Sequence, residues 1–271
     1  MGFCETFGGT FLILWLVGLV ISAVGFYKYV YFISLGYGFS VAGMGVAMLV
    51  LFWDRLTVGT ALLCALLVVY GCRLGGYLLV REIKSASYRA TMKREIKDGG
   101  GMNLAVKCAI WVSCALLYVL QVSPVHFRLR MGGGTEGFCL AGAAVMLCGL
   151  ALEATADLQK SRAKAKDPKR FCDKGLYRLV RCPNYLGELL FWTGVLLSGG
   201  GALQGPWQWA AAVLGWACIV YIMFGGARRL ELRQNRNYGD DPAYQAYVRS
   251  TPILLPFVPL YSVAKYKWLV G

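Results

Sequence analysis

Long apolar runs follow one another along most of this chain, and they constrain its fold more than any other feature. A run of about 17–25 predominantly apolar residues is long enough to cross a bilayer as a helix. Only 15% of the 271 residues are charged, against about 25% in soluble domains. We therefore predict an all-α, polytopic membrane protein with about seven transmembrane helices, folded as one domain over residues 1–271. The seven runs are residues 10–27, 29–53, 56–80, 103–123, 135–156, 186–203 and 206–226.

The formal net charge of +14 is concentrated after three of these runs, in residues 73–97, 157–181 and 228–249. Lys and Arg accumulate in cytoplasmic loops. We therefore place these regions and the 27–29 link in the cytoplasm, with the N-terminus outside and the C-terminus cytoplasmic. The same charge is explained by orientation of the spans and contact with anionic lipid headgroups, so nucleic-acid binding is not expected.

Several familiar chemical sites are absent from the sequence. The ten cysteines form no CxxC pair, and His126 is the only histidine, so a metal site is not expected. No GxGxxG opens a helix after a strand, and no Walker, GxSxG or HExxH motif occurs. A nucleotide cofactor, if one binds, must lie among helix ends and loops.

Polar side chains occur where apolar runs begin or end, and ionisable groups in such places suggest function. Glu153 and Asp157 are four residues apart and share a helix face, although a solvated helix end explains them equally well. Asn184 and Glu188 repeat this spacing after Pro183, which suits the first turn of a helix. Such a helix N-terminus attracts anions, and an amide that donates and accepts suits a nicotinamide carboxamide. Capping alone would explain Asn184, but it would not explain Glu188.

A third polar group follows the last run. Arg228, Arg229 and Arg233 suit phosphates, because a guanidinium forms paired hydrogen bonds. Tyr244 and Tyr247 offer rings against which an adenine could stack. Juxtamembrane arginines are more often simple anchors, so this group alone indicates little.

Together these motifs resemble those of the membrane steroid 5α-reductases and their bacterial relatives, over roughly residues 55–260. The resemblance implies a seven-helix fold that holds NADPH on its cytoplasmic side. The first family pattern, "E…AD-Q-K", corresponds here to Glu153, Asp157, Gln159 and Lys160. The second, "G-L-(aromatic)…R-x-P-N-Y-x-G-E", corresponds to Gly175, Leu176, Tyr177, Arg181, Pro183, Asn184, Tyr185, Gly187 and Glu188. The third, "Y-x-x-Y-x-x-x-T-P-x-x-x-P", corresponds to Tyr244, Tyr247, Thr251, Pro252 and Pro256. The cofactor-binding candidates are Glu153, Asp157, Lys164, Arg170, Asn184, Glu188, Arg228, Tyr244 and Tyr247.

The third run contains "VVYGCRLGGY", which is similar to the family segment with the substrate-facing tyrosine. The resemblance implies that Tyr70 is catalytic and hydrogen-bonds the substrate ketone, polarising the conjugated alkene. An interfacial aromatic residue is the alternative. Tyr77 lies on the same helix face and is a further candidate for substrate binding. The family pairs its tyrosine with a glutamate from the second span, but this chain has no carboxylate there, so Tyr37 or Ser40 would supply the second hydrogen bond.

The implied activity is NADPH-dependent reduction of the C4–C5 double bond of a 3-keto-4-ene steroid or similar enone lipid. The nearest alternative is a membrane S-adenosylmethionine-dependent methyltransferase of isoprenylcysteine or phospholipid type, which shares an "RHP-x-Y" start and a Tyr/Pro-rich tail. Asn184, the Gly187–Glu188 pair and the upstream acids favour the reductase. A transporter tends to place polar groups near the midplane, whereas here they gather toward one side. We expect a multi-pass protein with its cofactor side cytoplasmic and no obligate protein partner.

Overall fold

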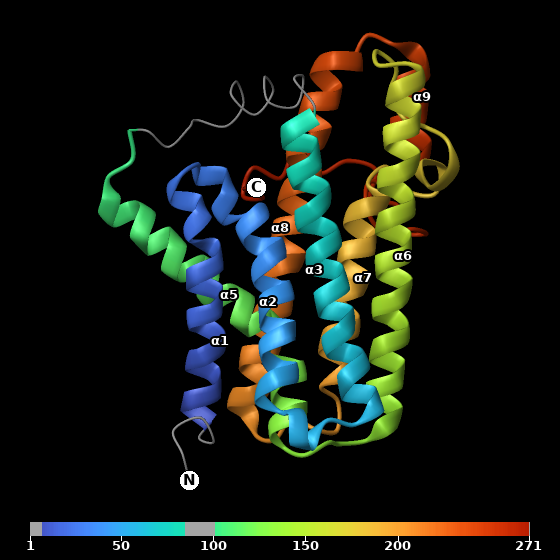
Figure 1. Cartoon of the computed structure of the whole chain (residues 1–271). Coiled ribbons are helices and arrows are strands. Elements are labelled where there is room, and N and C mark those ends of the chain that lie inside the picture. The colour runs from blue at the N-terminus through green and yellow to red at the C-terminus, as the bar shows by residue number, and fades with distance from the viewer. Residues whose placement is uncertain (1–6, 85–100, 271) are drawn as a thin grey trace. The chain divides into compact units, whose positions relative to one another are not determined.

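The computed structural model describes residues 7–84 and 101–270, and all regular structure within these ranges is helical. The all-α prediction is confirmed. Residues 85–97 of the first basic region lie outside the described residues. Short 3-10 turns cover Ala23–Phe26, Tyr29–Phe32, Trp53–Arg55 and Gly175–Arg178. The α-helices are α1 (Phe7–Ser22), α2 (Leu35–Leu51), α3 (Val58–Lys84), α5 (Leu104–Arg130), α6 (Glu136–Lys166), α7 (Pro183–Ser198), α8 (Pro206–Tyr238) and α9 (Pro242–Ser250), as Figure 1 shows.

Six helical segments of the described residues are long and apolar enough to cross a membrane: Gly8–Phe26, Tyr29–Leu51, Val58–Lys84, Leu104–Arg130, Glu136–Lys166 and Pro206–Tyr238. The seventh expected run, 186–203, corresponds to α7, which has 16 residues. At 1.5 Å per residue, α7 is about 24 Å long, shorter than a hydrocarbon core of about 30 Å. These ranges therefore contain six candidate spanning segments, and α7, which no adjoining helical turn extends, is not among them.

Helices α6 and α8 continue beyond the apolar runs from which they were predicted. They end at Lys166 and Tyr238, so they carry the charged stretches 157–166 and 228–238 as helix. These stretches are rich in Ala, Leu, Lys, Arg, Gln and Glu, which are strong helix formers. Hydropathy marks where the apolar surface ends, whereas helix propensity decides where the helix ends.

The chain forms two compact units. Unit 1 comprises residues up to 143 with 195–215, and unit 2 comprises 144–194 with 216–271. Helices α6, α7 and α8 each contribute to both units, so neither unit is a continuous stretch of sequence. The single domain over 1–271 stays a prediction.

Unit 1 is held together by close packing of α2 on α3. A Cβ atom on Gly38 would lie 2.8 Å from the backbone nitrogen of Gly75, which is too close for any side chain. Small residues let helix backbones approach in this way. Lys28 Nζ pairs with Glu82 Oε1 at 2.6 Å, so the link after α1 and the end of α3 lie at the same end of unit 1. Their placement in the cytoplasm stays a prediction.

The other end of unit 1 contains a buried arginine. The side chain of Arg128 is fully buried near the end of α5. It donates from Nε to the carbonyl of Ser198 at 2.6 Å, and from Nη2 to those of Gly200 and Thr135 at 2.8 and 3.1 Å. Carbonyls at the C-terminal end of a helix lack intrahelical partners, and Arg128 supplies donors to those of Ser198 and Gly200 at the end of α7.

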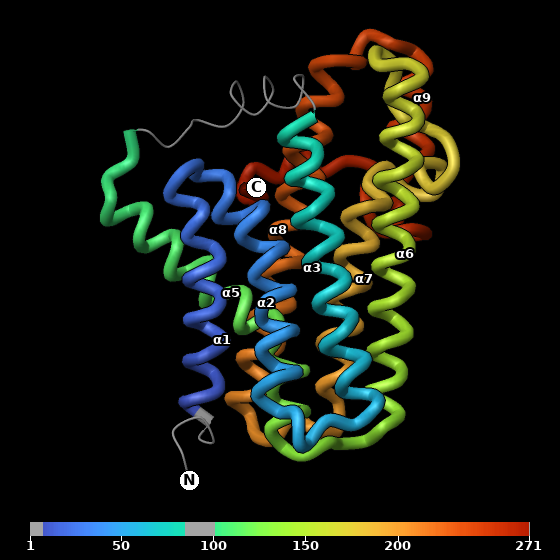
Figure 2. Tube along the Cα trace, in the orientation of Figure 1, coloured from blue at the N-terminus to red at the C-terminus, as the bar shows by residue number. Residues whose placement is uncertain are grey.

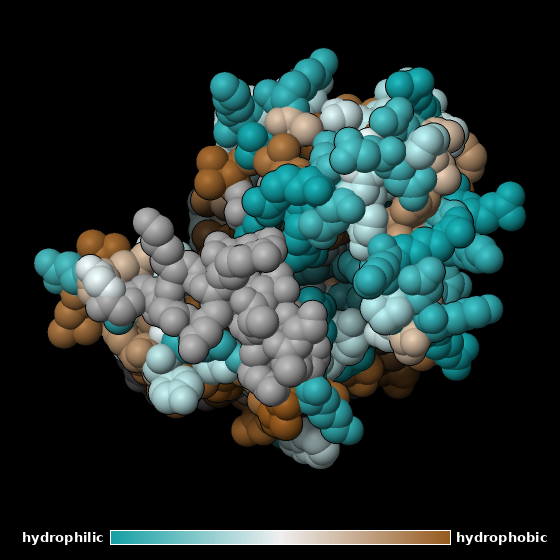
Figure 3. Space-filling view, turned by 90° about the horizontal axis from the view of Figure 1, so that it is seen from above, coloured by the Kyte–Doolittle hydropathy of each residue, from teal (hydrophilic) through white to brown (hydrophobic). Residues whose placement is uncertain are grey.

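Unit 2 contains all of the predicted cofactor residues. Its C-terminal segment, residues 251–270, returns along the start of α7 and along α8, as the red end of the trace in Figure 2 illustrates. Backbone bonds from Arg181 to Pro252 (2.8 Å) and from Cys182 to Ile253 (2.9 Å) fix the start of this segment. In Figure 3, hydrophilic side chains gather on the face where α6, α8 and α9 end.

Candidate functional site

The two predicted polar pairs of unit 2 lie on adjoining helices. A Cβ atom on Gly187 of α7 would lie 2.6 Å from the backbone nitrogen of Glu153 on α6. The helices therefore touch at the level of these pairs. Glu153, Asp157 and Glu188 are all buried, and each makes interactions within the protein. Burial of a carboxylate is costly unless it has partners, so three buried acids in one region indicate a built polar site.

Asn184 lies inside the first turn of α7, because the helix begins at Pro183. An N-cap residue precedes the first helical residue, so Asn184 is not the cap. Its side chain is partly buried, and Oδ1 is a buried acceptor that has no hydrogen-bond partner in the described part of the chain. Such an atom can accept an N–H from a ligand.

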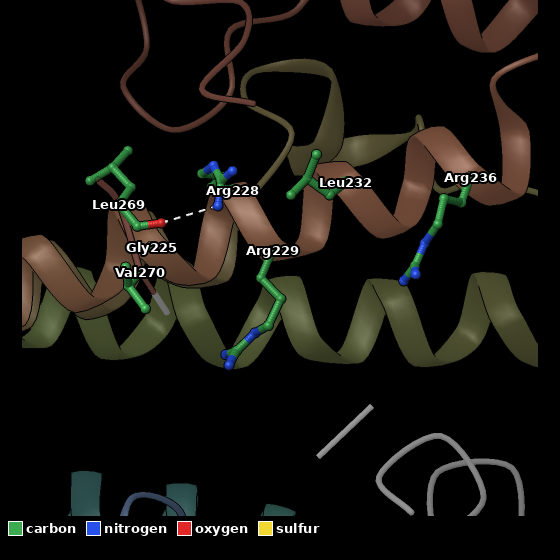
Figure 4. Close-up of a pocket in the computed structure, with 7 residues that line it drawn as sticks. All are labelled: Gly225, Arg228, Arg229, Leu232, Arg236, Leu269 and Val270. Atoms are coloured by element: carbon green, nitrogen blue, oxygen red, sulfur yellow. Dashed lines mark hydrogen bonds between the residues drawn. The ribbon is translucent and has the colours of Figure 1, made fainter. Parts of the chain in front are cut away.

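An arginine-lined groove of about 450 Å³ lies on α8. Arg228, Arg229 and Arg236 recur at helical spacing, so they share one broad face of α8. Arg228 donates to the carbonyls of Ala264 (3.2 Å) and Leu269 (3.3 Å). Figure 4 shows Arg229 and Arg236 extending to the same side of α8, whereas Arg228 turns toward Leu269. We call this the arginine groove; Gly225, Leu232, Leu269 and Val270 complete its lining.

Tyr185 connects the α7 pair with the α8 arginines. Its phenol lies near Glu188 on its own helix and near Arg229 and Arg233 on α8. Gly226 makes room for the ring, since a Cβ atom there would lie 3.3 Å from Tyr185 Cε2. The predicted amide and carboxylate of α7 therefore belong to the same region as the arginine groove.

Lys164 and Arg170 have other partners in the structure. Lys164 Nζ donates to the carbonyls of Pro168 (3.0 Å) and Arg170 (2.6 Å) and to the hydroxyl of Tyr238 (2.8 Å). It thereby fixes the loop after α6. Arg170 Nη2 forms an exposed ion pair with Asp173 at 2.9 Å. Their contacts with a cofactor stay predictions, and each would first have to exchange these partners.

Tyr244 and Tyr247 belong to an aromatic cluster. Both rings pack on Phe171, with ring centroids 5.3 and 5.5 Å apart. The Tyr244 hydroxyl donates to Asn235 at 2.7 Å, and that of Tyr247 donates to the carbonyl of Tyr177 at 2.6 Å. Burial raises the pKa of Tyr244 to about 12 and raises that of Tyr247 further, so both stay protonated donors. Stacking of an adenine on them stays a prediction, because Phe171 already lies against both rings.

Sequence reasoning missed a buried ion pair. Arg181 belongs to the α7 motif, and its Nη2 lies 2.8 Å from Glu231 Oε1, with both side chains only 1% exposed. Glu231 Oε2 also accepts from the backbone of Val263 at 2.8 Å, and Arg181 donates to the carbonyl of Tyr261. The available signal was that Glu231 is the only acid in the basic stretch "GARRLELRQNRNY".

The predicted substrate residues lie in unit 1. The hydroxyls of Tyr37 on α2 and Tyr70 on α3 form a hydrogen bond of 3.0 Å, and both side chains are buried. Ser40 instead donates to the carbonyl of Gly18 at 3.3 Å, and Tyr77 lies near Arg81. Of the four candidates, the structure brings together Tyr37 and Tyr70.

Comparison with known families gives one match. The family described as "Protein of unknown function (DUF1295)" matches residues 14–251. This chain belongs to the DUF1295 family. The match extends through both units, from α1 past the end of α9. No curated protein and no solved structure matches this DUF1295 chain.

Proposed function

We propose that this DUF1295 chain is an NADPH-dependent membrane reductase of the steroid 5α-reductase type. Its substrate would be a 3-keto-4-ene steroid, or a similar flat enone lipid, reduced at the C4–C5 double bond. The observation that supports this most is the arginine groove of α8, beside which Tyr185 of α7 packs on Gly226. Asn184 and Glu188 lie in the same first turns of α7 as Tyr185. Groups that can bind phosphate and a group that can bind an amide therefore belong to one region, which supports the proposal.

The residues of unit 2 fit the parts of a dinucleotide. Guanidiniums bind phosphates through paired, charge-assisted hydrogen bonds, and Arg228, Arg229 and Arg236 line one groove. The buried Oδ1 of Asn184 is an acceptor for a carboxamide N–H. Buried carboxylates such as Glu188 suit amide or ribose protons. When bound, the nicotinamide would supply the hydride.

In unit 1, Tyr70 would donate a hydrogen bond to the carbonyl oxygen of the enone. Negative charge develops on that oxygen during reduction, and a donor fixed in a dry interior stabilises it strongly. The Tyr37 hydroxyl, 3.0 Å from that of Tyr70, would orient Tyr70. The contact between Gly38 and Gly75 holds α2 and α3 together near this pair, so its geometry does not depend on flexible side chains.

The test is in two steps. Purified protein in nanodiscs is first heated with NADPH, NADH or S-adenosylhomocysteine. We expect NADPH to raise the melting temperature most; stabilisation by S-adenosylhomocysteine alone would indicate the methyltransferase instead.

Membranes are then incubated with NADPH and a panel of enone lipids, and products are analysed by mass spectrometry for a gain of two hydrogens. Loss of NADPH stabilisation in Arg229→Ala, but not in Arg249→Ala on α9, would assign the effect to the arginine groove.

A further inference from the structure

The C-terminal segment contains a closed, protruding turn. Its base is fixed, because the backbone of Ile253 donates to the carbonyl of Leu260 at 2.9 Å, and Ile253 and Leu254 are fully buried. Pro256 and Pro259 flank the tip, and proline restricts the backbone. The turn is therefore a rigid projection of unit 2.

Phe257 lies at the tip of this turn, and both the exposure of its side chain and its backbone conformation are unfavourable in water. Its side chain is 94% exposed. Its φ is +64°, and it is the only non-glycine with positive φ in residues 7–84 and 101–270. A large side chain in the left-handed region costs free energy, and exposure of the ring recovers none of it. Strained residues cluster at functional positions, and an apolar environment for the ring would offset this cost.

The rest of the segment has the composition of a membrane interface. Residues 251–270 contain Lys265 and Lys267 and no acid. Trp268 is 65% exposed and stacks on Tyr221, with ring centroids 6.2 Å apart. Tyr221 donates to the Trp268 carbonyl at 2.7 Å, and it is an exposed residue of α8, a helix of spanning length. The segment therefore lies along the outer surface of a candidate span.

We propose that residues 256–270 form an interfacial anchor that binds anionic phospholipids. Phe257 enters the boundary between headgroups and acyl chains, as exposed apolar residues of interfacial segments do. Trp268 lies at headgroup level, where Trp and Tyr are enriched. Lys265 and Lys267 contact lipid phosphates. The positive charge favours an anionic lipid over a neutral one, and this anchor requires no enzymatic activity.

Photocrosslinking tests the anchor directly. p-Benzoylphenylalanine replaces Phe257 in protein held in nanodiscs of equal phosphatidylglycerol and phosphatidylcholine, and adducts are identified by mass. The same label at Leu214, exposed on α8, is the positive control, and at Asp240, in the turn after α8, the negative control. We expect lipid adducts at position 257 comparable to those at 214, with none at 240. Adducts of position 257 with protein would overturn the proposal. So would the absence of adducts at position 257 when the label at position 214 does form lipid adducts.

The charge requirement is tested with the same label. We expect phosphatidylglycerol adducts at position 257 to exceed phosphatidylcholine adducts several-fold, and the ratio to fall toward one in Lys265→Gln/Lys267→Gln. An unchanged ratio in that variant would overturn the role of the lysines. The label at Val258, also exposed in this turn, replaces the one at 257 if that variant does not fold.

Discussion

Removal of Glu231 should loosen the whole C-terminal segment of unit 2. Its two carboxylate oxygens hold two groups: Oε1 pairs with Arg181, and Oε2 accepts from the backbone of Val263. Arg181 in turn holds the carbonyl of Tyr261. One ion pair therefore ties the start of α7, the middle of α8 and the returning segment together.

The expected loss is large because the remaining charge cannot reach water. Both side chains are 1% exposed, so Glu231→Ala leaves a buried guanidinium without its anion. Breaking a buried pair in this way costs about 3–5 kcal/mol. Replacing both partners by apolar residues of similar size, Arg181→Met/Glu231→Leu, removes the buried charges together and is often close to neutral. The double variant should therefore be more stable than either single variant.

The free energy of unfolding is measured by titrating mixed micelles with a denaturing detergent, in a double-mutant cycle. Limited proteolysis provides the local readout, with faster cleavage after residue 251 expected in Glu231→Ala. Additive losses in the cycle, or a loss below about 1 kcal/mol in Glu231→Ala, would contradict the 3–5 kcal/mol expected for an isolated buried charge.

Three further predictions follow from the other contacts. Tyr70→Phe should lower the turnover of enone substrate about 100-fold, the order expected for one lost donor to a developing charge. Tyr37→Phe should lower the turnover less, and steady-state kinetics would measure both effects. The affinity for NADPH should be unchanged in both variants, as a cofactor titration would show. Gly187→Ala should destabilise the protein by about 1–3 kcal/mol, because the new methyl group meets the backbone of α6, and thermal unfolding would report this. Cys182 should resist a maleimide at pH 8, because burial raises its thiol pKa to about 11 and the thiolate is the nucleophile.

Each of these has a matched control. Tyr27→Phe removes an exposed phenol outside the tyrosine pair and should leave turnover unchanged. Gly76→Ala adds a methyl group where nothing lies within 4 Å, and it should not destabilise. A cysteine introduced at Asp240, exposed in the turn after α8, should react within the time in which Cys182 does not. Rapid labelling of Cys182 in folded protein would contradict its burial.

Hydropathy was sufficient to predict the all-helical class and six spanning segments, but not where helices end. It overestimated the length of α7 by including residues 199–203, where the chain turns at Gly201 with φ +71°. It underestimated α6 and α8, whose charged ends remain helical. Hydropathy reports solvent preference, and it does not register helix propensity or a left-handed glycine.

The site was predictable where its signal is local. The spacing of Asn184 and Glu188 identified one polar face of α7 from neighbouring residues alone. The contact between Gly187 and Glu153 was not predictable, because it joins two residues that are 34 positions apart in the chain. The same limit applies to Arg181 and Glu231, whose pairing depends on tertiary packing and has no periodicity in sequence.

The close attachment of the last residues to α8 has a practical consequence for tagging. Leu269 and Val270 line the arginine groove, and Arg228 is oriented by the Leu269 carbonyl. An affinity tag or fluorescent protein joined directly after residue 270 would begin beside those guanidiniums. Such a fusion would crowd the groove and disturb Arg228, so a long hydrophilic spacer, or a label elsewhere, suits ligand-binding measurements better.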